Sequence, residues 1–449
     1  MLTLEDAQSH AEDLVAAARK AGADAADALY VCTAATQVSV RLGALEDVER
    51  SEGEEIGLRL FVGRRSATIS ASDMNPATLG SLVERCIAMA REAPEDPYAG
   101  LAPEELLIRK RPPALDLTDD ESEPSPEALR ERALEAEDAA RGVPGVSNSE
   151  GAGASNGRSQ VALVTSHGFA GSYAATSHGT WASVLAGAGA TMQRDHASHS
   201  VRHLEDLDEA ETIGTRAGQR AVARLNPMKI ESGAMPVIFD PRVSGGLIGH
   251  LIGGIVGPAI ARRSSFLLDS LGEQLFAPGI AIVDDPLRLR GLRSKPFDAE
   301  GLPTQRRLLV EDGRLTGWLL DSASARQLGA APTGHASRSG AGAPGAGASN
   351  VHLEPGRVSP GELMADVKRG LYVTELIGMG VNGITGDYSR GASGFLIENG
   401  AVVQAVAEIT IAGNLKDMFR SLVPANDLHF RYATNAPTVR VDGMTVAGG

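Results

Sequence analysis

Cysteine is nearly absent from this sequence, which contains only Cys32 and Cys86 among 449 residues. Neither belongs to a CxxC pair or to a Cys/His spacing of the kind that holds structural zinc. Two cysteines also cannot supply the disulfide framework on which small secreted domains depend. Residues 1–6 contain neither a basic region nor an apolar run, so no secretory signal is expected. We therefore expect a cytoplasmic protein.

Aromatic residues are scarce, at 4%, and basic residues are outnumbered by acidic ones. The 42 lysines and arginines face 57 aspartates and glutamates, which leaves a formal net charge of −15. Such a surface repels phosphate backbones and anionic lipid. No basic run exceeds a triplet, and no DNA-binding motif is present. Nucleic acid is therefore not expected as a partner.

One uncharged stretch, residues 243–261, has about the length of a membrane-spanning helix. It contains His250, Pro258 and six glycines, so its mean hydropathy is low for membrane insertion. The stretch therefore predicts a buried helix, and no membrane partner is expected.

Hydrophobic periodicity predicts an α+β first half. Helices are expected after the capping residue Thr3, after Asn75-Pro76, after Ser125-Pro126, and over residues 205–225. Alternating apolar residues predict strands at 38–42, 56–62 and 67–71, the last two joined as a hairpin at Gly63-Arg64. Residues 146–194 are small, polar and strand-like.

The chain is too long for one ordinary core, so two domains are expected. Residues 93–126 form a connector rich in proline and acid, and Asn226-Pro227 ends the last helix of the first half. We predict an N-terminal α+β domain with an antiparallel sheet at 1–228. A strand-rich C-terminal domain is predicted at 229–449, so the fold class is α+β with two domains.

The second half is predicted to begin with a buried strand at 237–239, followed by a glycine-rich helix. Further strands are expected at 280–283, at 307–310 turning into 315–319, and at 394–397 turning into 402–406. Residues 334–349 have low complexity and predict a mobile loop. Their GxGxxG match at 340–345 neither follows a strand nor opens a helix, so it does not indicate a nucleotide-binding loop.

The glycine-rich helix is the most informative segment. Glycines 245, 249, 253 and 257 recur every fourth residue, and each costs a helix about 1 kcal/mol relative to alanine. Either something packs on this face at backbone distance, or the helix is simply tolerant of glycine; both alternatives remain open. His250 is the only metal-ligating side chain in the helix, and catalytic zinc needs three protein ligands plus water.

Residues 244–254 resemble the helix of the TldD/PmbA family, whose active TldD members carry an HExxxH zinc motif. The resemblance continues through most of the chain in matching order, in the segments 262–267, 350–356, 380–394, 397–400, 408–415 and 436–438. The chain is thereby identified as a member of this family, on the PmbA (TldE) branch.

The resemblance implies a degenerate metal motif. Gly245 and Gly246 stand where the first His and the Glu are expected, and His250 alone matches. The active paralogue also supplies a cysteine ligand near its C-terminus, whereas residues 423–428 contain none. The resemblance therefore implies no catalytic residue and no metal in this chain, with zinc expected in a TldD-like partner.

The family further implies a heterodimeric TldD/TldE metallopeptidase that cleaves peptides or unfolded segments inside a closed chamber. This chain would contribute chamber wall, subunit interface and binding of an extended substrate strand, and would be inactive alone. A homodimer in the absence of the partner is left open.

An alternative is an independent metallohydrolase built on His196, His199 and His203, three histidines within eight residues. In a strand the first two would point to opposite faces, which favours solvated surface histidines. Ser393 lacks a GxSxG elbow, so a serine hydrolase is poorly supported.

Two polar groups could contact substrate or partner. Asp387 and Arg390 form either the rim of a peptide site or a local turn with a salt bridge. Asn414 and Lys416 either face the chamber or cap a helix.

Overall fold

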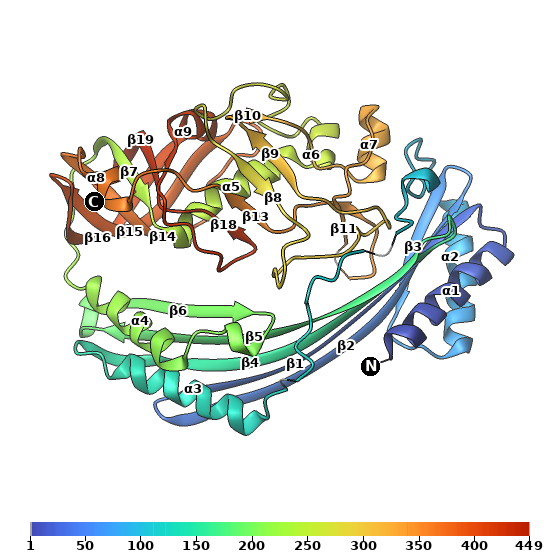
Figure 1. Cartoon of the computed structure of the whole chain (residues 1–449), viewed down its shortest axis with the longest axis horizontal. Coiled ribbons are helices and arrows are strands. Elements are labelled where there is room, and N and C mark those ends of the chain that lie inside the picture. The colour runs from blue at the N-terminus through green and yellow to red at the C-terminus, as the bar shows by residue number, and fades with distance from the viewer. Residues whose placement is uncertain (1, 111, 122, 339, 449) are drawn as a thin grey trace.

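The computed structural model describes residues 2–110, 112–121, 123–338 and 340–448. It is a mixed α+β fold in which one long curved sheet from the first half lies beneath a strand-rich second half (Figure 1). The strands of the long sheet end at Val201, and those of the other sheets begin at Gly233. The division at 228/229 remains a proposal that accords with this order.

The long sheet is antiparallel with the order β3-β2-β1-β4-β5-β6. Its strands are β1 (Ala25–Arg41), β2 (Ala44–Val62), β3 (Arg65–Ala71), β4 (Val146–Thr165), β5 (Ala170–Ala186) and β6 (Gln193–Val201). The predicted hairpin at 56–71 is confirmed, but β1 and β2 begin far before the predicted strands. Residues 26–30 are buried on both faces of β1, so they lack the alternation that marks a half-buried strand.

Two helix pairs cover one face of this sheet. They are α1 (Leu4–Lys20) with α2 (Pro76–Glu92), and α3 (Pro126–Arg141) with α4 (Ala210–Ala223). The predicted caps are confirmed, since Thr3, Asn75 and Ser125 each accept a backbone N–H of the first turn. The start predicted at 205 is wrong, because Leu204–Asp206 form a separate 3-10 turn.

The second half contains a closed barrel and a smaller sheet. The barrel strands are β7 (Gly233–Phe239), β14 (Arg369–Ile377), β15 (Asp387–Glu398), β16 (Ala401–Asn414) and β19 (Val439–Ala447), and pairing of β16 with β19 closes it. The short β17 (Val423–Pro424) extends β19. The smaller sheet has the order β10-β9-β8-β13-β18, with β8 at Ile282–Asp284, β9 at Arg307–Glu311, β10 at Arg314–Leu315, β13 at Val351–Leu353 and β18 at Thr434–Asn435.

The helices of this half are α5 (Pro241–Ile255), α6 (Gly257–Ala261), α7 (Ser322–Leu328), α8 (Pro360–Met364) and α9 (Leu415–Ser421). The strand predicted at 315–319 is wrong beyond Leu315, because the chain there turns so that Leu319 pairs with Val256. The uncharged stretch 243–261 is divided between α5 and α6. None of the described helices is both long and apolar enough to cross a membrane.

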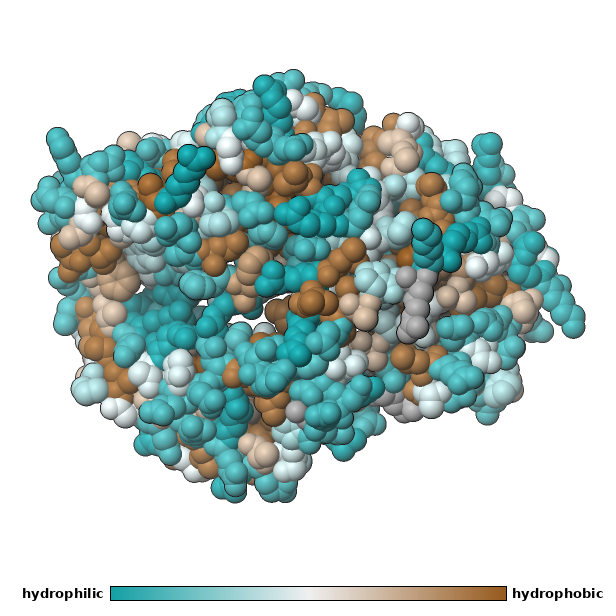
Figure 2. Space-filling view, in the orientation of Figure 1, coloured by the Kyte–Doolittle hydropathy of each residue, from teal (hydrophilic) through white to brown (hydrophobic). Residues whose placement is uncertain are grey.

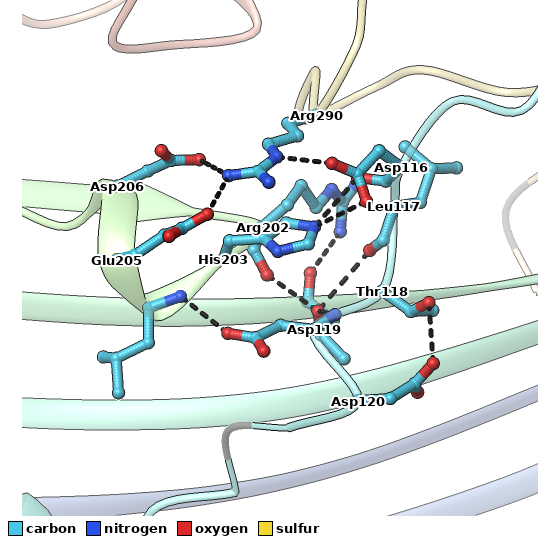
Figure 3. Close-up of polar contacts among 12 residues, drawn as sticks. Asp116, Leu117, Thr118, Asp119, Asp120, Arg202, His203, Glu205, Asp206 and Arg290 are labelled. Carbon is cyan, nitrogen blue, oxygen red and sulfur yellow. Dashed lines mark hydrogen bonds and ion pairs between the residues drawn. The ribbon is translucent and has the colours of Figure 1, made fainter.

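The connector before α3 is part of the fold rather than a free linker (Figure 3). Its Leu117 carbonyl accepts the backbone N–H of Thr176 on β5. Arg290, from the second half, donates to the carboxylates of Asp116, Glu205 and Asp206. These contacts tie the connector and the 3-10 turn to the second half, and α4 begins after the turn, at Ala210.

The low-complexity segment predicted to be a mobile loop lies between the two halves. It contains the short pair β11 (Ala336–Ser337) and β12 (Gly345–Ala346). Arg338 forms an ion pair with Asp27 on β1, and the backbone N–H of Ala341 donates to Glu55 on β2. The small residues of this segment therefore permit close packing on the long sheet.

Candidate functional site

The helix α5 buries one face and exposes glycine on the other. Asp240 caps it by accepting the backbone N–H of Arg242 at 2.9 Å. The buried stripe consists of Leu247, Ile248, Leu251 and Ile255. Gly246, Gly249 and Gly253 are exposed, and a Cβ added at any of the three would meet no atom within 4 Å.

The four regularly spaced glycines do not share one packing partner. A Cβ on Gly245 would lie 2.9 Å from the Thr434 carbonyl oxygen, and one on Gly257 would collide with Ser324. Between them, Gly249 and Gly253 face open space. At about 100° per residue, each step of four within α5 rotates about 40° further around the helix, and Gly257 lies in the separate helix α6.

Positions 245, 246 and 250 carry one ligating side chain among them. Gly245 and Gly246 offer only backbone, and His250 is the single imidazole. Burial and the nearby Arg390 lower the pKa of His250, so its ring is neutral near pH 7. Cys32 and Cys86 are both buried in the core between α1, α2 and the long sheet. This donor set does not fit zinc, because catalytic zinc sites use three protein ligands.

A cavity of about 280 Å³ lies beside His250. Gly249 and Gly253 form part of its wall, so the helix backbone itself borders the space. Phe266, Val381 and Leu415 supply apolar surface, and Arg390 supplies a cation. The site is therefore a small apolar cavity that carries one positive charge.

Asp387 and Arg390, predicted to form the rim of a peptide site or a local turn, have different hydrogen-bond partners in the structure. Asp387 accepts hydrogen bonds from the Thr385 hydroxyl at 2.6 Å and from the Asn414 amide at 3.3 Å, and these bonds lower its pKa. Asn414 caps α9 by accepting the backbone N–H of Lys416 at 3.1 Å. No Asp387–Arg390 ion pair is present among the described residues. Arg390 instead lines the cavity and donates its Nε–H to the Ile377 carbonyl.

The three clustered histidines have separate partners. His196 is 69% exposed beside Asp195, and Nδ1 of His199 accepts the backbone N–H of Asp208. His203 contacts the Asp116 carbonyl through Nε2. Across the described ranges, no group of three or more His, Cys, Asp or Glu side chains could hold a metal. The geometry gives no support to the independent metallohydrolase.

The sequence did not reveal a polar cavity on the helix-covered face of the long sheet, between the two helix pairs. This cavity of about 630 Å³ is bordered by Ala34 and Thr36 on β1 and by Arg158 and His178 on β4 and β5. The sequence feature that could have indicated this cavity lies in β1, where small and polar residues at even positions separate two apolar runs.

Comparison with known proteins connects this geometry to a family. A curated relative, the "Metalloprotease PmbA" of Escherichia coli O157:H7, is 39% identical over 447 residues, covering 99% of this chain and 96% of the relative. The chain belongs to the PmbA/TldD family. Models described as PmbA/TldA metallopeptidase domain 1, central domain and C-terminal domain match residues 26–90, 119–225 and 232–448.

Other members of the PmbA/TldD family agree along the chain. The "Metalloprotease PmbA homolog" of Haemophilus influenzae is 34% identical and covers 99% of this chain and 96% of its own length. A Bacteroides thetaiotaomicron crystal structure, described provisionally as a modulator of DNA gyrase, superposes with a TM-score of 0.92 at 27% identity over all of both chains. TldE of Thermococcus kodakarensis shares the fold, with a TM-score of 0.85 at 22% identity, over 98% of this chain and all of TldE.

Proposed function

We propose that this protein is the non-catalytic, PmbA/TldE-like subunit of a cytoplasmic heterodimeric metallopeptidase. A TldD-like partner would hold the zinc and cleave peptides or unfolded segments. This chain would supply chamber wall, subunit interface and binding of the substrate strand.

The proposal rests on the few side chains of α5 that could act as metal ligands. Metal-assisted hydrolysis needs a metal-bound water and a base that activates it. At the family's motif positions this chain offers Gly245, Gly246 and one neutral imidazole, His250. The described residues that line the cavity beside the helix include neither a glutamate that could act as a base nor a cysteine thiolate.

The shape of the long sheet supports a role as chamber wall. One face of this sheet is directed toward the second half. Where the two halves are not in contact, this face carries small polar residues that are exposed or half-buried, such as Ser155, Ser177, Ser198 and Ser200. Figure 2 shows the molecule hollowed between the sheet and the second half. Such a surface can face an aqueous space without exposing an apolar patch.

The edge of β2 supports strand binding. The short β3 pairs only with residues 56–62, so along residues 44–55 the outer edge of β2 has no strand partner in the described chain. An open edge presents free N–H and C=O groups to an extended peptide. The acidic side chains along residues 46–55 discourage pairing of two identical edges.

Reconstitution tests the proposal. The purified chain should contain no stoichiometric zinc by elemental analysis and should not cleave a fluorogenic peptide, whereas mixing it with a TldD-like subunit should yield chelator-sensitive cleavage. A partner whose HExxxH glutamate is replaced by glutamine is the inactive control. His250→Ala in this chain should leave kcat of the complex within about twofold, because His250 has no role in the hydrolytic chemistry, and any contribution of His250 to substrate binding would appear in KM. Chelator-sensitive cleavage by the isolated chain, lost in His250→Ala, would refute the proposal.

A further inference from the structure

The cavity beside α5 has the size of a single amino-acid residue. Its volume is about 280 Å³, slightly below the usual range for small-molecule sites. Because Gly249 and Gly253 have no side chains, a bound group could lie directly against the helix. A larger residue at either position would occupy the cavity itself.

The rest of the wall is largely apolar. Phe266, Val381 and Leu415 border the space, and so does Met379, which is 92% exposed. Ile384, in the same loop, is 65% exposed. Exposed apolar side chains grouped around a cavity favour an occupant that carries an aliphatic or aromatic group.

Among the described residues that line the cavity, Arg390 is the one that carries a formal charge. No carboxylate of the described chain lies within ion-pair distance of its guanidinium, whose one described hydrogen bond joins Nε to the Ile377 carbonyl at 3.3 Å. Its Nη donors therefore remain available for a ligand. A guanidinium binds a carboxylate through paired, charge-assisted hydrogen bonds.

We propose that this cavity binds the carboxyl-terminal residue of a peptide, with the terminal carboxylate on Arg390 and an apolar side chain against Gly249 and Gly253. In a peptide, only the last residue carries a carboxylate and an apolar side chain on the same Cα. An internal leucine lacks the carboxylate, and an internal glutamate lacks the apolar group. His250 borders the same space and can hydrogen-bond the last peptide group.

The inference rests on the proposed function in that it assumes peptides are the physiological ligands. Binding to the isolated chain needs neither the partner nor cleavage, so the two ideas can fail separately. Absence of cleavage in the reconstituted complex with intact peptide binding would reject the proposed function alone. Cleavage without terminal-residue binding would reject this inference alone.

Calorimetric titration of the full chain with N-acetyl-Ala-Ala-Ala-Leu tests the proposal, with the same peptide as its C-terminal amide for comparison. The free acid should bind at least about tenfold more tightly than the amide, since a charge-assisted hydrogen bond is lost in the amide. Arg390→Met should weaken binding of the acid to the level of the amide. Equal binding of acid and amide, or no binding of the acid at millimolar concentration, would overturn the proposal.

Two glycine variants test the position of the side chain. Gly253→Leu should abolish binding, because leucine fills the cavity. Gly246→Leu is the matched control: it lies on the same exposed face with no atom within 4 Å of an added Cβ, but does not line the cavity. The control should bind as the unmodified chain does. Unchanged binding in Gly253→Leu, with folding verified by circular dichroism, would place any bound peptide elsewhere.

Octanoate tests whether the ligand is a fatty acid rather than a peptide, because octanoate also joins a carboxylate to an apolar chain. The peptide acid should bind more tightly than octanoate, because the last peptide group adds a hydrogen bond. Tighter binding of octanoate, lost in Arg390→Met, would assign the cavity to fatty acids instead.

Discussion

Arg338 and Asp27, 311 residues apart, form a bidentate ion pair between the two halves of the molecule. Nη1 and Nη2 of the arginine each lie 2.9 Å from a carboxylate oxygen. The arginine and aspartate side chains are only 2% and 1% exposed. Arg59 on β2 contacts the same carboxylate, so one buried anion holds two cations at the contact between the halves.

Removal of this anion should destabilise the protein. Asp27→Asn leaves two buried guanidiniums without a counter-charge and is expected to cost about 3–5 kcal/mol. Arg338→Met should cost less, because Arg59 still pairs with Asp27. Urea unfolding measures both. Arg50→Met, at an ion pair whose side chains are 73% and 59% exposed, is the control and should change little. A loss in Asp27→Asn no larger than in the control would contradict the expectation.

The same group predicts loss of stability in acid. Burial pushes the pKa of Asp27 upward, but Arg338 and Arg59 outweigh it and hold the pKa below its ordinary value of 3.8. The stability it contributes is present above the unfolded-state pKa and is lost as pH falls through the lower folded-state pKa. Unfolding free energies at pH 6 and pH 3 should therefore differ more for the unmodified chain than for Asp27→Asn. Parallel pH profiles would argue against this assignment.

Glu300 should have the opposite effect on the pH dependence of stability. It is 3% exposed, and one of its oxygens accepts both the backbone N–H and the hydroxyl of Ser322. Burial, and then Asp298, raise its pKa above 4.5. The folded state holds this proton more tightly, so stability falls as pH rises from 4.5 through the raised pKa.

Glu300→Gln should therefore stabilise the protein at pH 8 and have little effect near pH 4. The gain is on the order of 1 kcal/mol for each unit by which the pKa is raised. Thermal unfolding at the two pH values measures it, and Glu52→Gln on the exposed part of β2 is the control. Destabilisation by Glu300→Gln at pH 8 would show that the charged carboxylate is needed.

The close approach of Ala341 to β2 predicts a steric effect. A Cβ added at Gly57 would lie 2.3 Å from the Ala341 carbonyl oxygen, so Gly57→Ala should displace residues 336–346. The expected cost is about 1–3 kcal/mol, with faster amide exchange in that segment. Gly53→Ala on the same strand is the matched control, since its Cβ would meet the Thr33 hydroxyl at an ordinary 3.5 Å. Equal exchange in the two variants would show that the segment does not depend on this contact.

Cys86 should be unreactive in the folded protein. Its side chain is fully buried and burial raises its pKa to about 11. Because the thiolate is the nucleophile, alkylation by iodoacetamide at pH 8 should be far slower in native buffer than in guanidinium. Mass spectrometry of the labelled peptide follows both rates. Rapid labelling of native protein would mean that α2 opens readily from the sheet.

The sequence alone determined the features that depend on neighbouring residues. Helix starts at Thr3, Asn75 and Ser125 followed from local capping, because the cap and the N–H it accepts are at most three residues apart. The scarcity of metal ligands in α5 was equally evident, since residues 245 and 246 are glycine and only His250 carries a ligating side chain among these three positions. The PmbA/TldD family was also recognisable from ordered segments.

Tertiary structure decided what depends on distant partners. The first part of β1 escaped prediction because burial on both faces removes alternation. Residues 44–53 of β2 escaped it for another reason, since they are exposed throughout and show no apolar alternation. The low-complexity segment 334–349 packs on the long sheet at Asp27 and Gly57, which lie hundreds of residues away in the sequence. The open space beside Gly249 exists only because the loop before β15 and Arg390 on β15 border it without filling it. No local pattern can encode such a cavity, since its walls come from four separate parts of the chain.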